Sequence, residues 1–274
     1  MKKNISFKKH YALMLSTLFF TGMINADLQQ AEELEKRVVA ASCCTNDFAN
    51  ALESNSQEPL PVRILNVQTF TSSGTYTPTA NMKYCIVEAV GGGAGSGGCG
   101  GTANNTSAGA GSGGYTKALI TAAGIGASKA VVIGAAGAAG PSGANAGENG
   151  GNTTLGSTLV VANGGTGGPA GSGTATAGSA GGTLGSVSGT GVTLMVAIPG
   201  QAGGVSNPLA TGSSGVGGSS FYGAGGAACA VPAGANDGNV GTGYGAGASG
   251  SVSAGSATAG SAGAPGIMII TEYC

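Results

Sequence analysis

Residues 84–98 read YCIVEAVGGGAGSGG, a strand-like run that passes directly into glycine. The first seven residues are mostly apolar and partly β-branched or aromatic, which favours a buried strand. Residues 91–98 contain only Gly, Ala and Ser, so they offer almost no side chains to a core. The sequence therefore predicts a β-strand that continues into a glycine tract, and this combination decides the fold class.

The same alternation of apolar runs and glycine tracts continues to the C-terminus. Each apolar run has the length of a strand, and no helical periodicity appears in this part of the chain. The other predicted strands are residues 64–70, 75–77, 116–121, 129–133, 152–155, 158–162, 192–198 and 267–273. We expect a mainly β domain over residues 64–274, with a base of short strands that carries glycine-rich segments.

The glycine tracts limit how these segments can be held. The chain has 57 Gly and 9 Pro among 274 residues, yet no strict Gly-X-Y repeat, which excludes collagen. Glycine can follow an extended three-fold path of the polyproline-II type, which has no internal hydrogen bonds. Because glycine loses the most conformational entropy on ordering, we expect such segments to need neighbouring chains and a rigid base. The alternative interpretation is a set of flexible loops.

The N-terminus has the features of an export signal. Four lysines at positions 2, 3, 8 and 9 precede an apolar run over residues 11–24 and a small residue, Ala26. This pattern predicts a signal peptide over residues 1–26, and the run is short for a membrane span, which needs about 20 residues. An uncleaved anchor is the alternative. No later run is predicted to cross a membrane as a helix.

Residues 27–58 differ from the glycine-rich part of the chain because they hold no glycine and seven of the eleven acidic residues. Apolar or small residues recur at steps of three and four, which is the spacing of a coiled-coil seam. We predict a helix here that sets an oligomer, with Leu34, Val38, Ala41, Phe48 and Leu52 as the oligomerisation residues. A single amphipathic helix is the alternative. Residues 59–63 form a proline-containing linker that ends the helix.

Charge and residue types exclude several functions. Loss of the four leader lysines leaves six of ten basic residues against eleven acidic ones, so nucleic-acid binding is not expected. The single histidine, His10, lies in the leader, which removes the usual base for a Ser or Cys nucleophile. Glu88 and Glu272 lie in two strong strands and are expected to face solvent or a cation. We predict no enzyme, no cofactor and no metal site.

The cysteines and aromatic residues are the remaining candidates. Six cysteines in an exported chain suggest disulfides, and their connectivity is open. Cys85 with Cys274 and Cys99 with Cys229 are possible pairs, while Cys43 and Cys44 could bridge chains. Four aromatic residues stand among glycines and could form a tip that stacks on sugars or enters a partner's pocket. The alternative is that they plug the base or a subunit seam; these residues are Tyr115, Phe221, Tyr222 and Tyr244.

Several segments resemble the glycine-rich domain of phage tail-fibre adhesins. They include TFTSSGTYTP at residues 69–78 and AVVIGAAG at residues 130–137, followed in the same order by residues 150–156, 162–168 and 265–273. The resemblance covers about residues 66–273. It implies a β base that carries polyglycine-II-like segments, with variable loops at their tips that recognise bacterial surface molecules.

The leader and the acidic segment 27–58 depart from that family, and they favour a cell that exports the domain for its own surface. We therefore expect a secreted or cell-surface structural subunit of an extracellular fibre or adhesive structure, which associates with itself. The alternative is a discrete adhesin that binds cell-surface glycans or proteins through loop tips. An ice-binding protein is a third, less favoured hypothesis.

Overall fold

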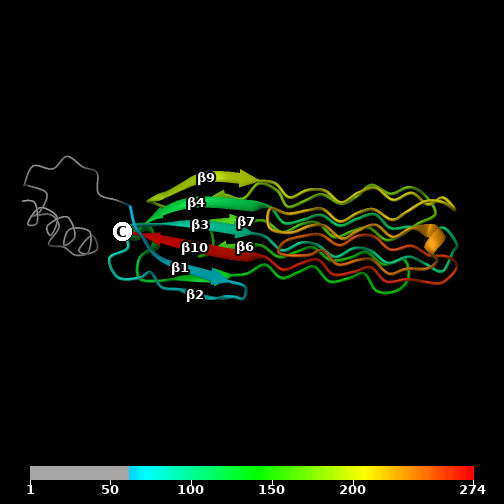
Figure 1. Cartoon of the computed structure of the whole chain (residues 1–274), viewed down its shortest axis with the longest axis horizontal. Helices are drawn as coiled ribbons and strands as arrows, with labels where there is room; N and C mark the ends of the chain where they lie inside the picture. Colours follow the sequence, from blue (N-terminus) through cyan, green and yellow to red (C-terminus); the bar gives the residue numbers. More distant parts are fainter. Residues whose placement is uncertain (1–61) are drawn as a thin grey trace, which may run out of the picture. The chain divides into compact units, whose positions relative to one another are not determined.

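The computed structural model describes residues 62–274, within which Ile64–Tyr273 form one compact unit (Figure 1). The predicted leader 1–26 and the predicted helix 27–58 lie outside the described residues. The same holds for the oligomerisation residues Leu34, Val38, Ala41, Phe48 and Leu52, for Cys43 and Cys44, and for most of the linker 59–63.

The first of two antiparallel sheets contains the longest strands. Its order is β1-β10-β3-β4-β9, so the first and last strands of the unit lie side by side. The strands are β1 (Ile64–Phe70), β10 (Ile267–Tyr273), β3 (Tyr84–Val90), β4 (Tyr115–Thr121) and β9 (Val192–Ile198). Their positions agree with the apolar runs in the sequence, and the predicted mainly β fold is confirmed.

The second sheet is built from shorter strands in the order β2-β5-β6-β7-β8. These are β2 (Gly74–Tyr76), β5 (Lys129–Val132), β6 (Thr153–Leu155), β7 (Val160–Ala162) and β8 (Ser186–Val187). One helical turn, α3 (Ala122–Ile125), follows β4. The Thr121 hydroxyl accepts a bond from the Gly124 N–H at its start, and Gly126 ends it with φ 68°.

The main hydrophobic core lies between the two sheets. On β3 the side chains of Cys85, Val87 and Ala89 are buried, while Ile86 and Glu88 between them are only partly buried, as the two-residue period of a strand requires. Leu155 and Val160 of the second sheet are fully buried in the same cluster. The apolar runs therefore become strands because each can place one face in this layer.

The core contains one buried carboxylate, on Glu272 of β10. Its Oε1 accepts bonds from the Tyr76 hydroxyl at 2.8 Å, the Thr79 N–H at 3.1 Å and the Gln68 amide at 3.4 Å. Within residues 62–274 its Oε2 has no hydrogen-bond partner. Glu272 was expected to face solvent or a cation; the solvent alternative was wrong, because alternation on β10 turns Glu272 inward with Met268 and Ile270.

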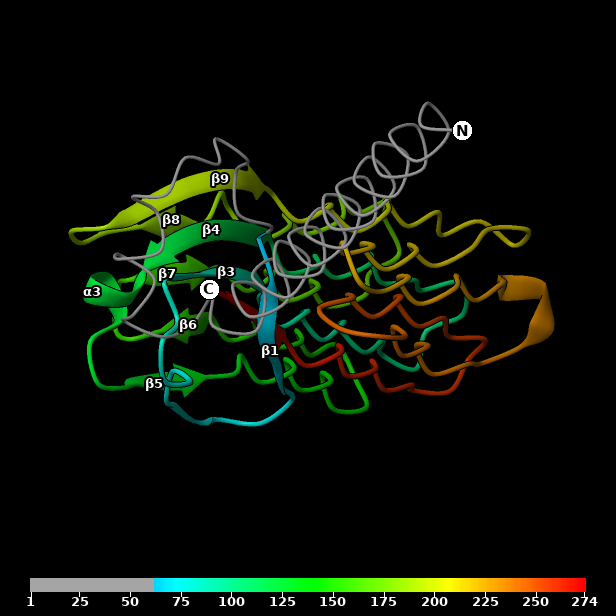
Figure 2. The ribbon, with the colours of Figure 1, turned by 60° about the vertical axis from the view of Figure 1, so that its left-hand side comes forward.

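We call residues 91–114, 134–152, 163–185 and 199–266 the glycine bundle. Its segments leave one end of the sheets and run side by side in an extended path to the distal end (Figures 1 and 2). There the chain turns and returns to the sheets. The 3-10 turn η1 (Val231–Ala233) is one of these distal turns. The prediction that a base of short strands carries glycine-rich segments is confirmed.

Backbone hydrogen bonds within the bundle repeat every three residues. The N–H groups of Gly92, Gly95 and Gly98 donate to residues 151, 148 and 145 of one neighbouring segment, at 2.8–3.0 Å. The N–H groups of Gly93, Ser96 and Cys99 donate to residues 264, 261 and 258 of another. A polyproline-II-type path has three residues per turn and no internal hydrogen bonds, so its backbone N–H and C=O groups must bond to neighbouring segments.

Segment 91–99 is surrounded by segments of the same chain. Its N–H and C=O groups bond to residues in 106–114, 134–141, 145–152, 163–172, 245–253 and 258–266. The sequence predicts that such segments form hydrogen bonds with segments of neighbouring chains. Instead one chain folds back often enough to supply every neighbour of this segment, so the expectation of dense interchain bonding was wrong for it.

Such close packing requires glycine at particular positions. A Cβ on Gly93 would overlap the carbonyl oxygen of Ala246, and one on Gly95 would overlap that of Ala138. Both obstacles are backbone atoms, which cannot rotate away as a flexible side chain would. The bundle therefore depends on glycine at those positions where a neighbouring backbone carbonyl occupies the place of a Cβ.

Candidate functional site

The four aromatic residues that the sequence singled out come together where the sheets meet the glycine bundle. Tyr115 begins β4, and Phe221 and Tyr222 lie in a turn closed by the bond from Ser220 N–H to Gly223 O. Tyr244 joins them because its N–H donates to the Tyr222 carbonyl at 3.1 Å. They meet because the bundle returns twice to the sheet end, which the sequence did not reveal.

Three of the rings are in direct contact. Phe221 stacks on Tyr115 with ring centroids 4.1 Å apart and planes 20° from parallel. Tyr222 meets both rings edge-on, at 6.1 Å from Tyr115 and 5.1 Å from Phe221. Tyr115 is only 4% exposed, whereas Phe221 is 55% exposed. Phe221 thus covers Tyr115 and presents aromatic surface to solvent.

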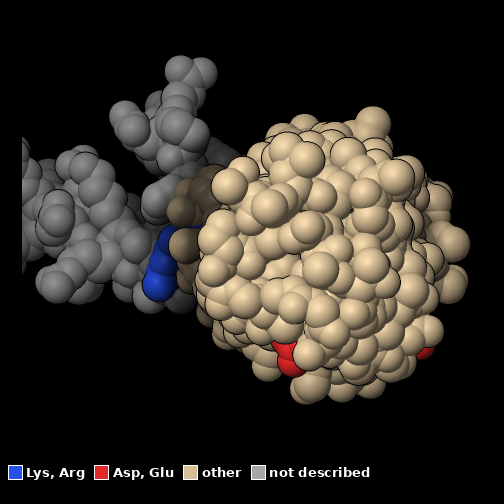
Figure 3. Space-filling view, turned by 90° about the vertical axis from the view of Figure 1, so that its right-hand side faces the viewer, with Lys and Arg blue, Asp and Glu red and all other residues tan. Residues whose placement is uncertain are grey.

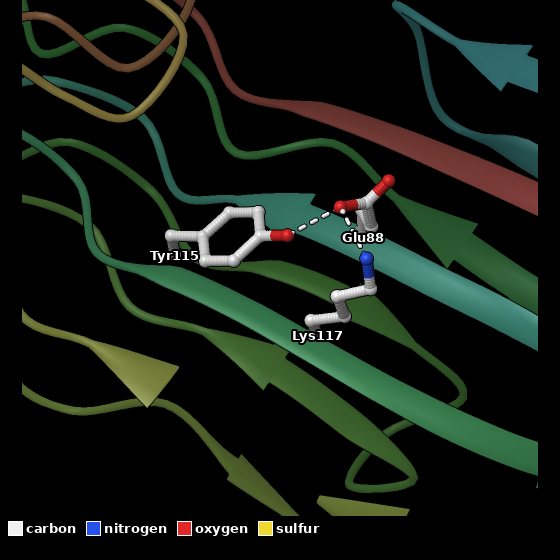
Figure 4. A network of polar contacts seen from close by, with 3 residues as sticks. All are labelled: Glu88, Tyr115 and Lys117. Carbon is white, nitrogen blue, oxygen red and sulfur yellow. Dashed lines mark hydrogen bonds and ion pairs between the residues drawn. The ribbon is translucent and has the colours of Figure 1, made fainter. Parts of the chain in front are cut away.

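A carboxylate and an ammonium group adjoin this cluster (Figure 4). Glu88 on β3 lies directly opposite Lys117 on β4, and Lys117 Nζ is 3.3 Å from Glu88 Oε1. The Tyr115 hydroxyl donates a hydrogen bond to the same oxygen. Sequence reasoning did not connect these residues, although the scarcity of charges between positions 89 and 271 was an available signal.

This arrangement keeps the tyrosines protonated. Burial raises the pKa of Tyr115, and the hydrogen bond to Glu88 and the charge of Glu88 raise it further. Burial also raises the pKa of Tyr222, with a smaller contribution from Glu88. Both phenols therefore remain neutral near pH 7, and Tyr115 acts as a hydrogen-bond donor that fixes the carboxylate.

The distal end of the bundle has a different character (Figure 3). Its turns consist mainly of small neutral residues, and the only charged residues of the glycine bundle are Glu148 and Asp237. The aromatic residues proposed for a tip do not lie there. Their placement at the sheet end fits the alternative that they fill the base, except that Phe221 remains exposed.

Within residues 62–274, neither the Cys85–Cys274 pair nor the Cys99–Cys229 pair is formed. Cys85, Cys99 and Cys229 are buried free thiols. Cys85 lies opposite Glu272, and Tyr84 lies opposite Tyr273. Cys274 is therefore two residues beyond the position on β10 that faces Cys85.

Cys99 and Cys229 lie in different surroundings. Cys99 accepts a bond from the Ser251 hydroxyl, whereas the Cys229 thiol bonds to the Asp237 carbonyl. Burial raises the pKa of Cys85 to about 11 and also raises that of Cys229, which makes both thiols poor nucleophiles near pH 7.

Residues 62–274 contain no group of three or more His, Cys, Asp and Glu side chains that could hold a metal ion. No helix in that range has the length and apolar character needed to cross a membrane.

Comparison with known proteins identifies the family. A family model described as a glycine-rich domain matches residues 68–273, about three quarters of the chain. The chain therefore belongs to the glycine-rich domain family. A search of the curated proteins finds no match.

Proposed function

We propose that this member of the glycine-rich domain family is an exported structural subunit of a cell-surface fibre or adhesive assembly. In this role the sheets are the attachment end, and the glycine bundle is a stiff spacer of the polyglycine-II type that holds its turns away from the base. The predicted leader directs the chain to the secretory route, and the seam over residues 27–58 brings copies together.

The observation that carries this proposal is the bonding around segment 91–99. Its partners come from six other segments of the chain and recur at a three-residue period. A single extended glycine segment would be flexible, because it has neither side-chain contacts nor internal hydrogen bonds. Cross-bonding on all sides removes that freedom, so the bundle is suited to act as a rigid shaft.

The backbone groups of segment 91–99 find their hydrogen-bond partners within one chain. We therefore assign self-association to other parts of the molecule. The seam residues 34, 38, 41, 48 and 52 are one candidate. A second candidate is the apolar surface at the start of the described residues, where Val62, Ile64 and Val67 are more than half exposed. Cys43 and Cys44 would add interchain disulfides beside the seam.

A second candidate function is a discrete adhesin that binds surface glycans or proteins through the distal turns. It is favoured by the resemblance to tail-fibre adhesins and by the distal surface, which is mostly uncharged with a few acidic atoms and carries short turns. In this case the protein acts as single particles and does not need to form fibres.

Negative-stain electron microscopy of the exported protein, oxidised and then reduced, separates the two functions. Fibres or oligomers that dissociate on reduction support the structural subunit with interchain disulfides. A variant with Leu34, Val38 and Phe48 each changed to Ser should lose them while the far-ultraviolet spectrum of the β domain is retained. Discrete particles that neither reduction nor this variant changes would contradict the fibre and favour the adhesin.

A further inference from the structure

We propose that the exposed face of the first sheet, beside Phe221, is a binding site for a neutral pyranose ring. This site lies at the sheet end and is separate from the distal turns. The proposal concerns a ligand of the chain itself and holds whether or not the protein forms fibres.

The strand register builds this face in two rows. Directly opposite residues on neighbouring strands share a face of the sheet. The first row runs across four strands as Ile267, Val90, Tyr115 and Ile198, and the second row as Ile269, Glu88, Lys117 and Val196. Successive rows lie about 7 Å apart along a strand, a spacing comparable to one sugar ring.

Phe221 stacks on Tyr115 of the first row, while Glu88 and Lys117 of the second row stay partly exposed. The Phe221 ring stacks on Tyr115 at 4.1 Å and is supported edge-on by Tyr222, so the aromatic wall is rigid. Val196 at 42% and Ile198 at 40% exposure continue the apolar surface on the β9 side. Sugar rings expose C–H groups on one face, and these pack on aromatic and aliphatic surfaces of this kind.

The centre of the second row is polar and only partly engaged. The Glu88 and Lys117 side chains are 23% and 31% exposed, and their mutual contact and the Tyr115 bond all use Glu88 Oε1. Glu88 Oε2 is therefore left as an acceptor, and Lys117 Nζ retains donors for a ligand. One acceptor and one donor side by side match the vicinal hydroxyl groups of a pyranose.

The charges also favour a neutral ligand. Glu88 and Lys117 compensate each other, so the site presents no net field to attract an anion or a cation. An apolar wall beside a fixed donor and acceptor is the arrangement that orients small polar ligands. A charged peptide or phosphate would leave one of the two charges without compensation.

Saturation-transfer NMR with the full chain tests this site. The probes are methyl β-D-galactopyranoside, methyl β-D-glucopyranoside and N-acetyl-D-glucosamine, each tested separately. We expect saturable binding of at least one probe in the millimolar range. Phe221→Ala and Lys117→Met should each weaken it about tenfold, the first by removing the stacking wall and the second by removing the donor.

Tyr84→Ala is the matched control, because Tyr84 stacks on Tyr273 at 5.0 Å on the same face but lies opposite Thr121 on β4. It should leave binding unchanged. Thermal unfolding of each variant shows whether it is folded. If Phe221→Ala does not fold, the binding measured for Lys117→Met still tests the site. The proposal is overturned if no probe binds, or if binding survives in both site variants, as it would at the distal turns. It is also overturned if the variants change only the oligomeric state, which would make this face a subunit contact.

Discussion

In the sheets, Leu155, Val160 and Ile270 are fully buried and fill the space between two layers with side-chain atoms. In the glycine bundle, Gly93 and Gly95 leave no space for a Cβ, and backbone hydrogen bonds connect the segments. Both regions belong to one compact unit, yet the first is stabilised mainly by what its side chains bury and the second mainly by backbone segments that approach closely at their glycines.

This difference changes what a substitution does. In a side-chain core, removing atoms is costly because a cavity remains, while conservative changes of shape are tolerated. In the bundle, adding one carbon is costly because the obstacle is a backbone carbonyl that is itself hydrogen-bonded. A sequence can therefore be very poor in large apolar residues and still specify a packed structure, provided that its segments can approach each other closely.

The largest effect is expected from Gly93→Ala inside the bundle. The new Cβ would overlap the Ala246 carbonyl oxygen, so the variant should lose more than about 3 kcal/mol in free energy of unfolding. Urea denaturation measures the loss. Gly101→Ala is the control, because its Cβ would meet nothing nearer than 3.5 Å, and it should change stability by less than about 0.5 kcal/mol. Equal effects at both sites would contradict close packing of the bundle.

The opposite change should be costly in the sheets. Leu155→Ala removes a fully buried side chain of the main core and should cost about 2 to 4 kcal/mol. Leu184→Ala, at a position that is 59% exposed, is the matched control and should have little effect. Thermal unfolding of the two variants compares them, and a neutral Leu155→Ala would show that the sheets do not depend on this core.

A smaller effect is expected from the buried carboxylate. Glu272→Ala leaves the Tyr76 hydroxyl and the Thr79 N–H without their acceptor, which should cost about 2 kcal/mol. Glu272→Gln keeps an acceptor oxygen in place and should cost less. Denaturant melts of both variants give the comparison. If Gln is as destabilising as Ala, the charge of Glu272 matters more than its hydrogen bonds.

The smallest expected effect is a loss of stability at alkaline pH that originates in the sheets. Burial raises the Cys85 pKa from 9.0 to about 11, so the folded chain holds a proton that the unfolded chain has already released. Stability is therefore complete below pH 9 and falls as the pH rises from 9 toward 11, by about 1 kcal/mol at pH 10. Cys85→Ala should flatten the dependence of Tm on pH in this range. An unchanged slope would assign the loss to other groups, such as Tyr76.

Much of the base could be predicted from sequence because its signals are local. The run 84–90 is apolar and strand-like, and the structure makes it β3; the run 192–198 becomes β9 in the same way. The resemblance to a glycine-rich domain also held at the level of the family. The four aromatic residues could be identified as candidates, because an aromatic side chain in a glycine tract is conspicuous. The place where they meet and their contact with Glu88 could not be predicted from the sequence.

The sequence by itself determined the strands except the short β8, the glycine tracts between them and the scarcity of charge, because each follows from the properties of neighbouring residues. Only the tertiary structure decided which segments bond to which, that Glu272 turns into the core and that Phe221 covers Tyr115. The physical reason is that glycine tracts carry no side-chain pattern to specify a partner. Their neighbours are set by the order in which the strands enter the sheets, and that order is a property of the whole chain.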